Sequence, residues 1–301
     1  IKKTIGLNNP CRLLEKLFDC LVTPILTYCS EIWGVDSHFK DSDPFEKLHV
    51  KFIKDILGVH CKASNDGCRA ELNRIPLKNK ILYSIFNYLN HIVSSENSLA
   101  YDIFTKSVDS NPWVIKVKSL LNELGMSYII NNFNYVKGNL NSIKQRINDQ
   151  CLQVQNANIF ESKKLDFFKS VYIMGRRPPY VDILKNRSDR AAICKIRISA
   201  HTLMIERGRH LNIPRNERYC SVCNSGQIEN EKHFLLHCEK YSTKRDIFYH
   251  KVSNIIVDPT KFQKHENNII FLLNNNSYTI LKLTSSFISD SLNLRKAEQT
   301  L

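Results

Sequence analysis

The sequence predicts a mainly α-helical protein, in which helical bundle segments accompany one small module built on cysteine and histidine. Apolar residues recur at steps of three and four along most of the 301 residues, which is the spacing that gives a helix one apolar face. The alternation that is typical of strands is nearly absent. With 43% hydrophobic residues, the chain has enough material for two or three domains with ample core.

The N-terminal quarter contains three helical patterns. The first runs from Cys11 to Trp33, and Pro24 should kink it or divide it in two, because proline removes a backbone donor. The second starts near Pro44 and ends at Gly58, a residue type that favours helix C-termini, and the third follows Pro76. The first pattern should bury a stripe made of Leu14, Leu17, Leu21, Ile25, Tyr28 and Ile32.

The rest of the chain continues in the same way. Asn111 and Ser188 are expected to begin helices as N-terminal caps, and Gly125 to end one. The further helical stretches expected lie at 112–124, 139–155, 160–174, 188–206, 264–273 and 278–295.

The stretch CSVCNSGQIENEKHFLLHC, residues 220–238, has the spacing of a metal site. Cys220 and Cys223 are separated by two residues, so a tight turn can direct both sulfurs at one ion, and His233 and Cys238 return beyond a polar loop. We interpret these four residues as the ligands of a zinc ion. The ion should be structural, because four protein ligands leave no open position for water or substrate.

The fourth ligand has two candidates, Cys238 and His237. In one unbroken helix His233 and His237 would share a face, whereas Cys238 would point well round the cylinder. A thiolate is the softer zinc donor, and the helix could end before Cys238, so Cys238 is preferred. The alternative for the whole stretch is that it holds ordinary buried cysteines and surface histidines.

The chain is basic, with 43 lysines and arginines against 29 acidic residues and a formal net charge of +14. Half of this excess lies between Arg176 and Arg218, where nine of eleven basic residues are arginines. Guanidinium groups bind phosphate with two parallel hydrogen bonds, so we expect RNA and/or DNA as partner, the alternative being a solvated polar face. The expected contact residues are Arg190 and Arg197 on one helix face and, in the connector before the first cysteine, Arg207, Arg209, Arg215 and Arg218.

No run of about 18 apolar residues is present, and the first residues lack the apolar segment of a signal peptide. We expect an intracellular protein, of the nucleus and/or cytoplasm, without a membrane or a small-molecule substrate as partner. Its oligomeric state is not predicted. The remaining seven cysteines are expected to be buried thiols of a reducing compartment: Cys11, Cys20, Cys29, Cys61, Cys68, Cys151 and Cys194.

Signatures of an independent enzyme are missing. The sequence contains no GxxxxGK[ST], GxGxxG or GxSxG pattern, and no two aspartates are adjacent. We therefore expect no catalytic residues in this chain.

Six stretches, in this order, resemble the C-terminal part of the reverse transcriptases of non-LTR retrotransposons (LINE elements). Their sequences are LFDCLVTPILTYCSEIWG (17–34), EKLHVKFIKDILGVHCKASN (46–65), AELNRIPL (70–77), RISAHTLMIERGRH (197–210), RYCSVCNSGQIENEKHFLLHCEKYSTKR (218–245) and FISDSLNLRK (287–296). The resemblance places the family's CCHC zinc ligands on Cys220, Cys223, His233 and Cys238.

The resemblance implies a four-part organisation. It consists of reverse-transcriptase thumb-like helices over 1–75, a helical linker over 76–187, a basic helix with the zinc knuckle over 188–245 and a helical tail over 246–301. In the family the catalytic aspartates lie in a palm that precedes the thumb. Because this chain begins after that palm, at Ile1, we expect it to be a non-catalytic piece of a longer RNA-directed DNA polymerase.

One residue departs from the family pattern, since Asn73 stands where glycine is usual and leaves a local turn in question.

The resemblance also implies that the thumb and the knuckle hold element RNA or target DNA. The alternative function is that of a retained or decayed retroelement fragment that acts as a zinc-stabilised protein-interaction module.

Overall fold

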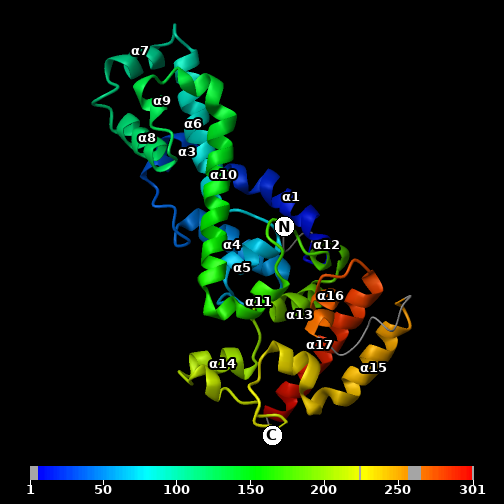
Figure 1. Ribbon diagram of the computed structural model, residues 1–301. Helices are drawn as coiled ribbons and strands as arrows, with labels where there is room; N and C mark the ends of the chain where they lie inside the picture. The colour runs from blue at the N-terminus through cyan, green and yellow to red at the C-terminus, as the bar shows by residue number, and fades with distance from the viewer. Residues whose placement is uncertain (1–5, 224, 257–265, 300–301) are drawn as a thin grey trace. The chain divides into compact units, whose positions relative to one another are not determined.

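The computed structural model describes residues 6–223, 225–256 and 266–299. In this part of the chain the mainly helical class is confirmed, and the one β pairing is an antiparallel bridge between Tyr219 and Ile228 (Figure 1). None of the described helices is both long enough and apolar enough to cross a membrane.

The described part of the chain forms the following helical elements. They are α1 (Cys11–Leu21), α2 (Thr23–Leu26), α3 (Ser30–Trp33), η1 (Gly34–Asp36), α4 (Pro44–Leu57), α5 (Asn65–Glu71), α6 (Lys78–Ser94), α7 (Leu99–Lys106), α8 (Pro112–Glu123), α9 (Tyr128–Asn131), α10 (Tyr135–Glu161), η2 (Lys163–Leu165), α11 (Asp166–Val171), α12 (Tyr180–Ile183), α13 (Arg187–Arg197), α14 (Met204–His210), η3 (Arg215–Glu217), η4 (His233–His237), η5 (Glu239–Tyr241), α15 (Ser242–Ser253), α16 (Glu266–Leu273) and α17 (Tyr278–Gln299).

The chain divides into two compact units, each assembled from separate stretches. Unit 1 comprises Ile1–Leu17, Lys51–Arg74 and Asn158–Leu301, and unit 2 comprises Phe18–Val50 and Ile75–Ala157. Each unit has a hydrophobic core of its own. The units cut across the consecutive segments expected from the sequence, since the first 75 residues are shared between both.

Unit 2 is built on α6. The apolar positions of α6 that keep helical spacing, among them Ile81, Ile85, Phe86 and Leu89, are fully buried, and α6 packs against α3 and α7. The helix expected to begin at Asn111 is confirmed, because the Asn111 side chain accepts a hydrogen bond from the backbone N–H of Trp113.

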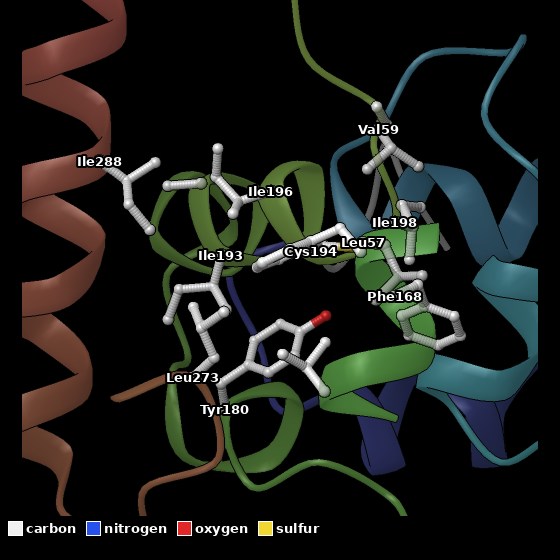
Figure 2. Close-up of a cluster of buried hydrophobic side chains, with 14 of the residues drawn as sticks. Leu57, Val59, Phe168, Tyr180, Ile193, Cys194, Ile196, Ile198, Leu273 and Ile288 are labelled. Atoms are coloured by element: carbon white, nitrogen blue, oxygen red, sulfur yellow. The ribbon is translucent and has the colours of Figure 1, made fainter. Parts of the chain in front are cut away.

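Unit 1 surrounds α13, which packs against α17, α11 and α12. Figure 2 shows Ile193, Cys194 and Ile196 of α13 pointing into a cluster with Tyr180 of α12 and Ile288 of α17. All five side chains are fully buried. This core supports the segment between α14 and α15, where the cysteine and histidine module lies.

The single helix expected over 188–206 is wrong. Its cap is Asn186, which accepts from the backbone N–H of Ser188, and α13 ends at Arg197. Ser199 then takes a left-handed conformation with φ of 51°, which no helix can continue through. The sequence from Met204 forms the separate helix α14.

The helix expected from Cys11 to Trp33 is also divided further than Pro24 alone would divide it. Cys29 has φ of 52° and separates α2 from α3. The expected buried stripe is confirmed only at its start, since Leu14 is buried, whereas Leu21, Ile25, Tyr28 and Ile32 are 57%, 75%, 77% and 51% exposed.

Two glycine stops are confirmed, because Gly58 and Gly125 follow α4 and α8 with φ of 73° and 68°. Asn73 adopts φ of 49°, a left-handed conformation that asparagine tolerates far better than most residues. The turn left in question by the absence of glycine is therefore formed. The stretches expected at 139–155 and 160–174 become one long helix, α10, followed by η2 and α11.

Of the two last helices, α17 is confirmed over the expected 278–295, and it continues to Gln299. The expected 264–273 helix is confirmed as α16 from Glu266 onward. Positions 264 and 265 lie outside the described residues.

Candidate metal centre

Four side chains converge in the segment between α14 and α15, which is yellow in Figure 1. One ligand atom from each of Cys220, Cys223, His233 and Cys238 lies within 4.8 Å of all the others. The Sγ atoms of Cys220 and Cys238 are 4.0 Å apart, and Cys223 Sγ lies 3.4 Å from His233 Nε2. The group could hold a metal ion, and it is the set of residues that the spacing in the sequence predicted.

A short hairpin presents the first two cysteines. The backbone N–H of Cys220 donates to the carbonyl oxygen of Gln227 at 2.8 Å, and that of Glu229 donates to the carbonyl oxygen of Arg218 at 2.9 Å. Together with the bridge between Tyr219 and Ile228, these bonds fix the two arms in register. Cys223 lies in the turn that joins these two paired arms.

A π-helical turn, η4, presents the other two ligands. The backbone N–H of Cys238 donates to the carbonyl oxygen of His233 at 2.8 Å, a bond that spans five residues where an α-helix spans four. The wider turn places Cys238 next to His233, and both side chains are buried. His237 is exposed and lies outside the group.

Gln227 orients the imidazole of His233, a contact that the sequence reasoning missed. His233 Nδ1 lies 2.9 Å from Gln227 Oε1, an acceptor, so the proton sits on Nδ1 and the lone pair of Nε2 faces the sulfurs. A carbonyl oxygen as partner of the second ring nitrogen is typical of metal-bound histidines. Nothing in the spacing of the sequence singles out Gln227.

The sulfur atoms of Cys220 and Cys238 lie within hydrogen-bonding distance of each other. The hydrogen bond from the Cys238 thiol lowers the pKa of Cys220, and the same bond raises the pKa of Cys238. A cation bound between the sulfurs would replace that proton, because metal ligation requires thiolates.

Arg245 of α15 braces the π-helical turn from behind. The buried guanidinium of Arg245 donates to the carbonyl oxygens of Leu235 at 2.9 Å and Cys238 at 2.8 Å. Both carbonyls lie at the C-terminal end of the π-helical turn, where backbone acceptors lack part of their helical partners, and that of Cys238 also accepts from the backbone N–H of Tyr241 at 3.2 Å. Arg245 thus fixes the backbone that carries Cys238, a role that only the folded structure shows.

The connector arginines differ in their surroundings. Arg207 is exposed, and its side chain forms no hydrogen bond or ion pair with any of the described residues. Arg209 pairs with Glu206 at 2.5 Å, and Arg215 pairs with Asp166 at 2.8 Å, both at half-exposed positions. Arg218 donates to two backbone carbonyl oxygens and is partly buried.

The expected phosphate contacts of Arg190 and Arg197 are wrong. Their side chains are 0% and 1% exposed. Arg190 donates to backbone carbonyl oxygens that include Leu184 at 2.8 Å, and Arg197 Nε donates to Glu71 at 2.7 Å. Both guanidinium groups bind acceptors inside unit 1 and hold α13 in place. Helical spacing put them on one face, but that face packs against protein.

The expectation of buried thiols is confirmed for four of the other cysteines and wrong for three. Cys11, Cys68, Cys151 and Cys194 are buried, and burial raises the pKa of Cys11 to about 11 and of Cys68 to about 12. The three exposed thiols are Cys20, Cys29 and Cys61.

Comparison with protein-family models, with curated proteins and with solved structures finds no match to this chain.

Proposed function

We propose that this chain is a non-catalytic nucleic-acid-binding segment, in which a structural zinc ion fixes an arginine-bearing connector. The observation that carries the proposal is the position of the exposed arginines on α14 and η3, directly before the metal group. Because six stretches of the sequence resemble the C-terminal part of LINE-type reverse transcriptases, we propose that the segment is that part of such an enzyme.

Zinc is the metal that the donor set favours. Bonds of about 2.3 Å to sulfur and 2.0 Å to nitrogen, in a tetrahedron, put two sulfurs about 3.8 Å apart and a sulfur and a nitrogen about 3.5 Å apart. The separations of 4.0 Å and 3.4 Å agree with this geometry. Three soft thiolates with one imidazole are typical of structural zinc, and the four ligands leave no open position for catalysis.

Arg207, Arg209 and Arg215 are the proposed phosphate contacts, because they are exposed and lie on α14 and η3 just before the hairpin. A flexible connector would lose conformational entropy when it becomes ordered on a nucleic acid, and that loss would lower its affinity. Here the backbone of Ile205 donates to Glu229 of the hairpin at 3.0 Å, so a zinc ion that orders the hairpin would also order the start of α14. Preorganised arginines would then bind phosphates without further folding.

The test measures binding of single-stranded RNA and of duplex DNA over a range of salt concentrations. We expect affinity to fall steeply with salt, and the double variant Arg207→Gln/Arg209→Gln to bind all sequences more weakly. The slope of log affinity against log salt should flatten by about 1.4 for single strands, the value of two phosphate contacts. Zinc removal should weaken binding although the arginines remain.

The matched control is Arg176→Gln/Lys185→Gln, which removes the same charge from two exposed positions outside the connector. Equal losses in both double variants would show that net charge alone attracts the nucleic acid. Full affinity after both the connector substitutions and zinc removal would contradict the proposal.

A second candidate function is that of a protein-interaction module. It is favoured by the exposed stripe of Leu21, Ile25, Tyr28 and Ile32 in unit 2, because neighbouring exposed apolar side chains commonly mark interaction surfaces. The salt titration separates the two candidates, since a protein-interaction module should show little affinity for RNA at any salt concentration.

A further inference from the structure

A cavity of about 290 Å³ lies in unit 1 beside the candidate metal centre. Its wall is formed by η2, the start of α11, α14, η3 and the arms of the hairpin. The volume is near the lower end of the range for small-ligand pockets, roughly 300 to 1,000 Å³. Five cationic side chains line it, and they are Lys163, Lys164, Arg209, Arg215 and Arg218.

Three carboxylates also line the cavity, and each is already engaged. Asp166 accepts from Lys169 and Arg215, both at 2.8 Å. Glu206 pairs with Arg209 and with Lys164. Glu231 accepts from Ser199 at 2.6 Å and lies 2.9 Å from His201 Nε2. The carboxylates are thus balanced by cations or hydrogen-bond donors of the protein itself.

Two of the cations have no carboxylate partner among the described residues. Lys163 is exposed, and its ammonium group forms no hydrogen bond or ion pair within the part of the chain that the structure describes. Arg218 donates only to the carbonyl oxygens of Ile205 at 2.6 Å and Ile213 at 3.0 Å. Because a guanidinium has five N–H donors, three of those of Arg218 remain for a ligand. The cavity therefore has a surplus of positive charge and of donors.

The side chain of Arg218 lies directly over Gly208. A Cβ atom at residue 208 would come within 2.7 Å of Arg218 Cγ and 2.9 Å of Cδ. Real Cβ atoms essentially never make such contacts, so an alanine at 208 has to displace the stem of Arg218. The sequence thus provides a substitution that moves a cavity cation without altering the charge.

We propose that this cavity binds a phosphate group of a nucleic-acid strand, held by Arg218 and Lys163. The inference rests on the proposed function and names the place where a phosphate is held. Phosphate matches the cavity because it is an anion whose several oxygens can accept from more than one donor at once. Ile205 and Phe167 add apolar wall, against which the sugar of the same nucleotide can pack.

The cavity is joined to the candidate metal centre through the backbone. The carbonyl oxygen of Arg218 accepts from Glu229 N–H across the hairpin, and Glu231 lies two residues before the ligand His233. A metal ion that holds the hairpin would therefore also hold two residues of the cavity wall.

The experiment measures binding of a short fluorescent single-stranded RNA to the zinc-loaded full chain and to two variants. Lys163→Gln removes one cation that makes no internal contact, and the salt slope should flatten by about 0.7, the value of one phosphate contact. Gly208→Ala keeps the charge and should weaken binding about tenfold, because a charge-assisted hydrogen bond is lost. The control Lys185→Gln, exposed and outside the cavity wall, should bind like the unmodified chain.

Metal content and thermal unfolding of each variant show whether the fold is kept. RNA binding by the unmodified chain with unchanged affinity in both Lys163→Gln and Gly208→Ala overturns the cavity assignment and leaves the proposed function standing. Absence of RNA binding in the unmodified chain overturns both. Competition by micromolar inorganic phosphate or adenosine monophosphate would show that the cavity takes a free phosphate ligand, which overturns the assignment to a strand.

Discussion

At the scale of single residues, the choice between Cys238 and His237 depends on one turn of backbone. An α-helical HFLLH would have aligned the two histidines. The bond from Cys238 N–H to the carbonyl oxygen of His233 makes the turn one residue wider, so that Cys238 takes the place beside His233. His237 is left in solvent.

The first prediction follows from this geometry. Cys238→Ser should lower metal affinity strongly, because a hydroxyl is a much poorer zinc ligand than a thiolate, whereas His237→Ala should bind metal like the unmodified chain. Metal analysis and cobalt substitution spectra of the purified proteins measure this. The reverse pattern would assign the fourth position to the histidine, and the absence of metal from all three proteins would contradict the site.

The buried arginines show a second effect at this scale. Arg197 donates to Glu71, and its guanidinium lies over the rings of Phe168 and Tyr180 at 5.9 Å and 5.7 Å. Tyr180 donates to the same carboxylate. An arginine on an amphipathic pattern is thus a packing residue here, with its charge balanced by a buried glutamate.

At the scale of elements, the hairpin is held from outside by α17. Arg295 of α17 makes two hydrogen bonds to Glu229, at 2.7 Å and 2.6 Å, and both side chains are fully buried. Glu229 also accepts from the backbone N–H of Met204 at 2.6 Å. One carboxylate therefore connects the hairpin, α14 and α17.

The second prediction concerns this connection. Arg295→Met should lower the free energy of unfolding of unit 1 by about 3 to 5 kcal/mol, because it leaves the negative charge of Glu229 buried without an opposite charge beside it. Urea unfolding monitored by circular dichroism measures the loss. Metal affinity should fall as well, since Glu229 belongs to the hairpin that presents Cys220.

The control for this prediction is the double variant Arg295→Met/Glu229→Gln. It removes both charges and keeps an acceptor for Met204 N–H, so it should recover a large part of the lost stability. A single variant that unfolds within about 1 kcal/mol of the unmodified chain would show that the pair does not stabilise unit 1.

At the scale of the whole molecule, the described residues form two hydrophobic cores that share no residue. The metal group, the cavity and the exposed arginines of the connector all belong to unit 1. Removal of a structural metal ion should therefore act on unit 1 and leave the core of unit 2 intact.

The third prediction is that a zinc chelator lowers the melting temperature of unit 1 by about 10 °C. Zinc at a free concentration a thousandfold above its Kd contributes about 4 kcal/mol, and 1 kcal/mol corresponds to about 2 to 4 °C for a unit of this size. Calorimetry measures the shift. Hydrogen exchange should show faster exchange over residues 218–238 with α6 unchanged, and equal acceleration in both units would contradict the prediction.

The sequence by itself determined the helical class, most helix positions and the four residues of the metal group. These features depend on local spacing: apolar residues three and four apart, glycine at the ends of α4 and α8, and two cysteines separated by two residues. Such patterns act between neighbours in the chain, so they can be recognised without knowledge of the fold.

Only the tertiary structure decided which polar residues are buried and how the chain divides into units. Arg190 and Arg197 have the same spacing on a helix whether that face meets water or protein, and only the packing of α13 made them internal. Glu229 accepts a hydrogen bond from Arg295, which is far from it in the sequence. Lys163 and Arg218, also far apart in the sequence, line the same cavity. Contacts of this kind depend on which surfaces the folded chain brings together, and no local pattern encodes them.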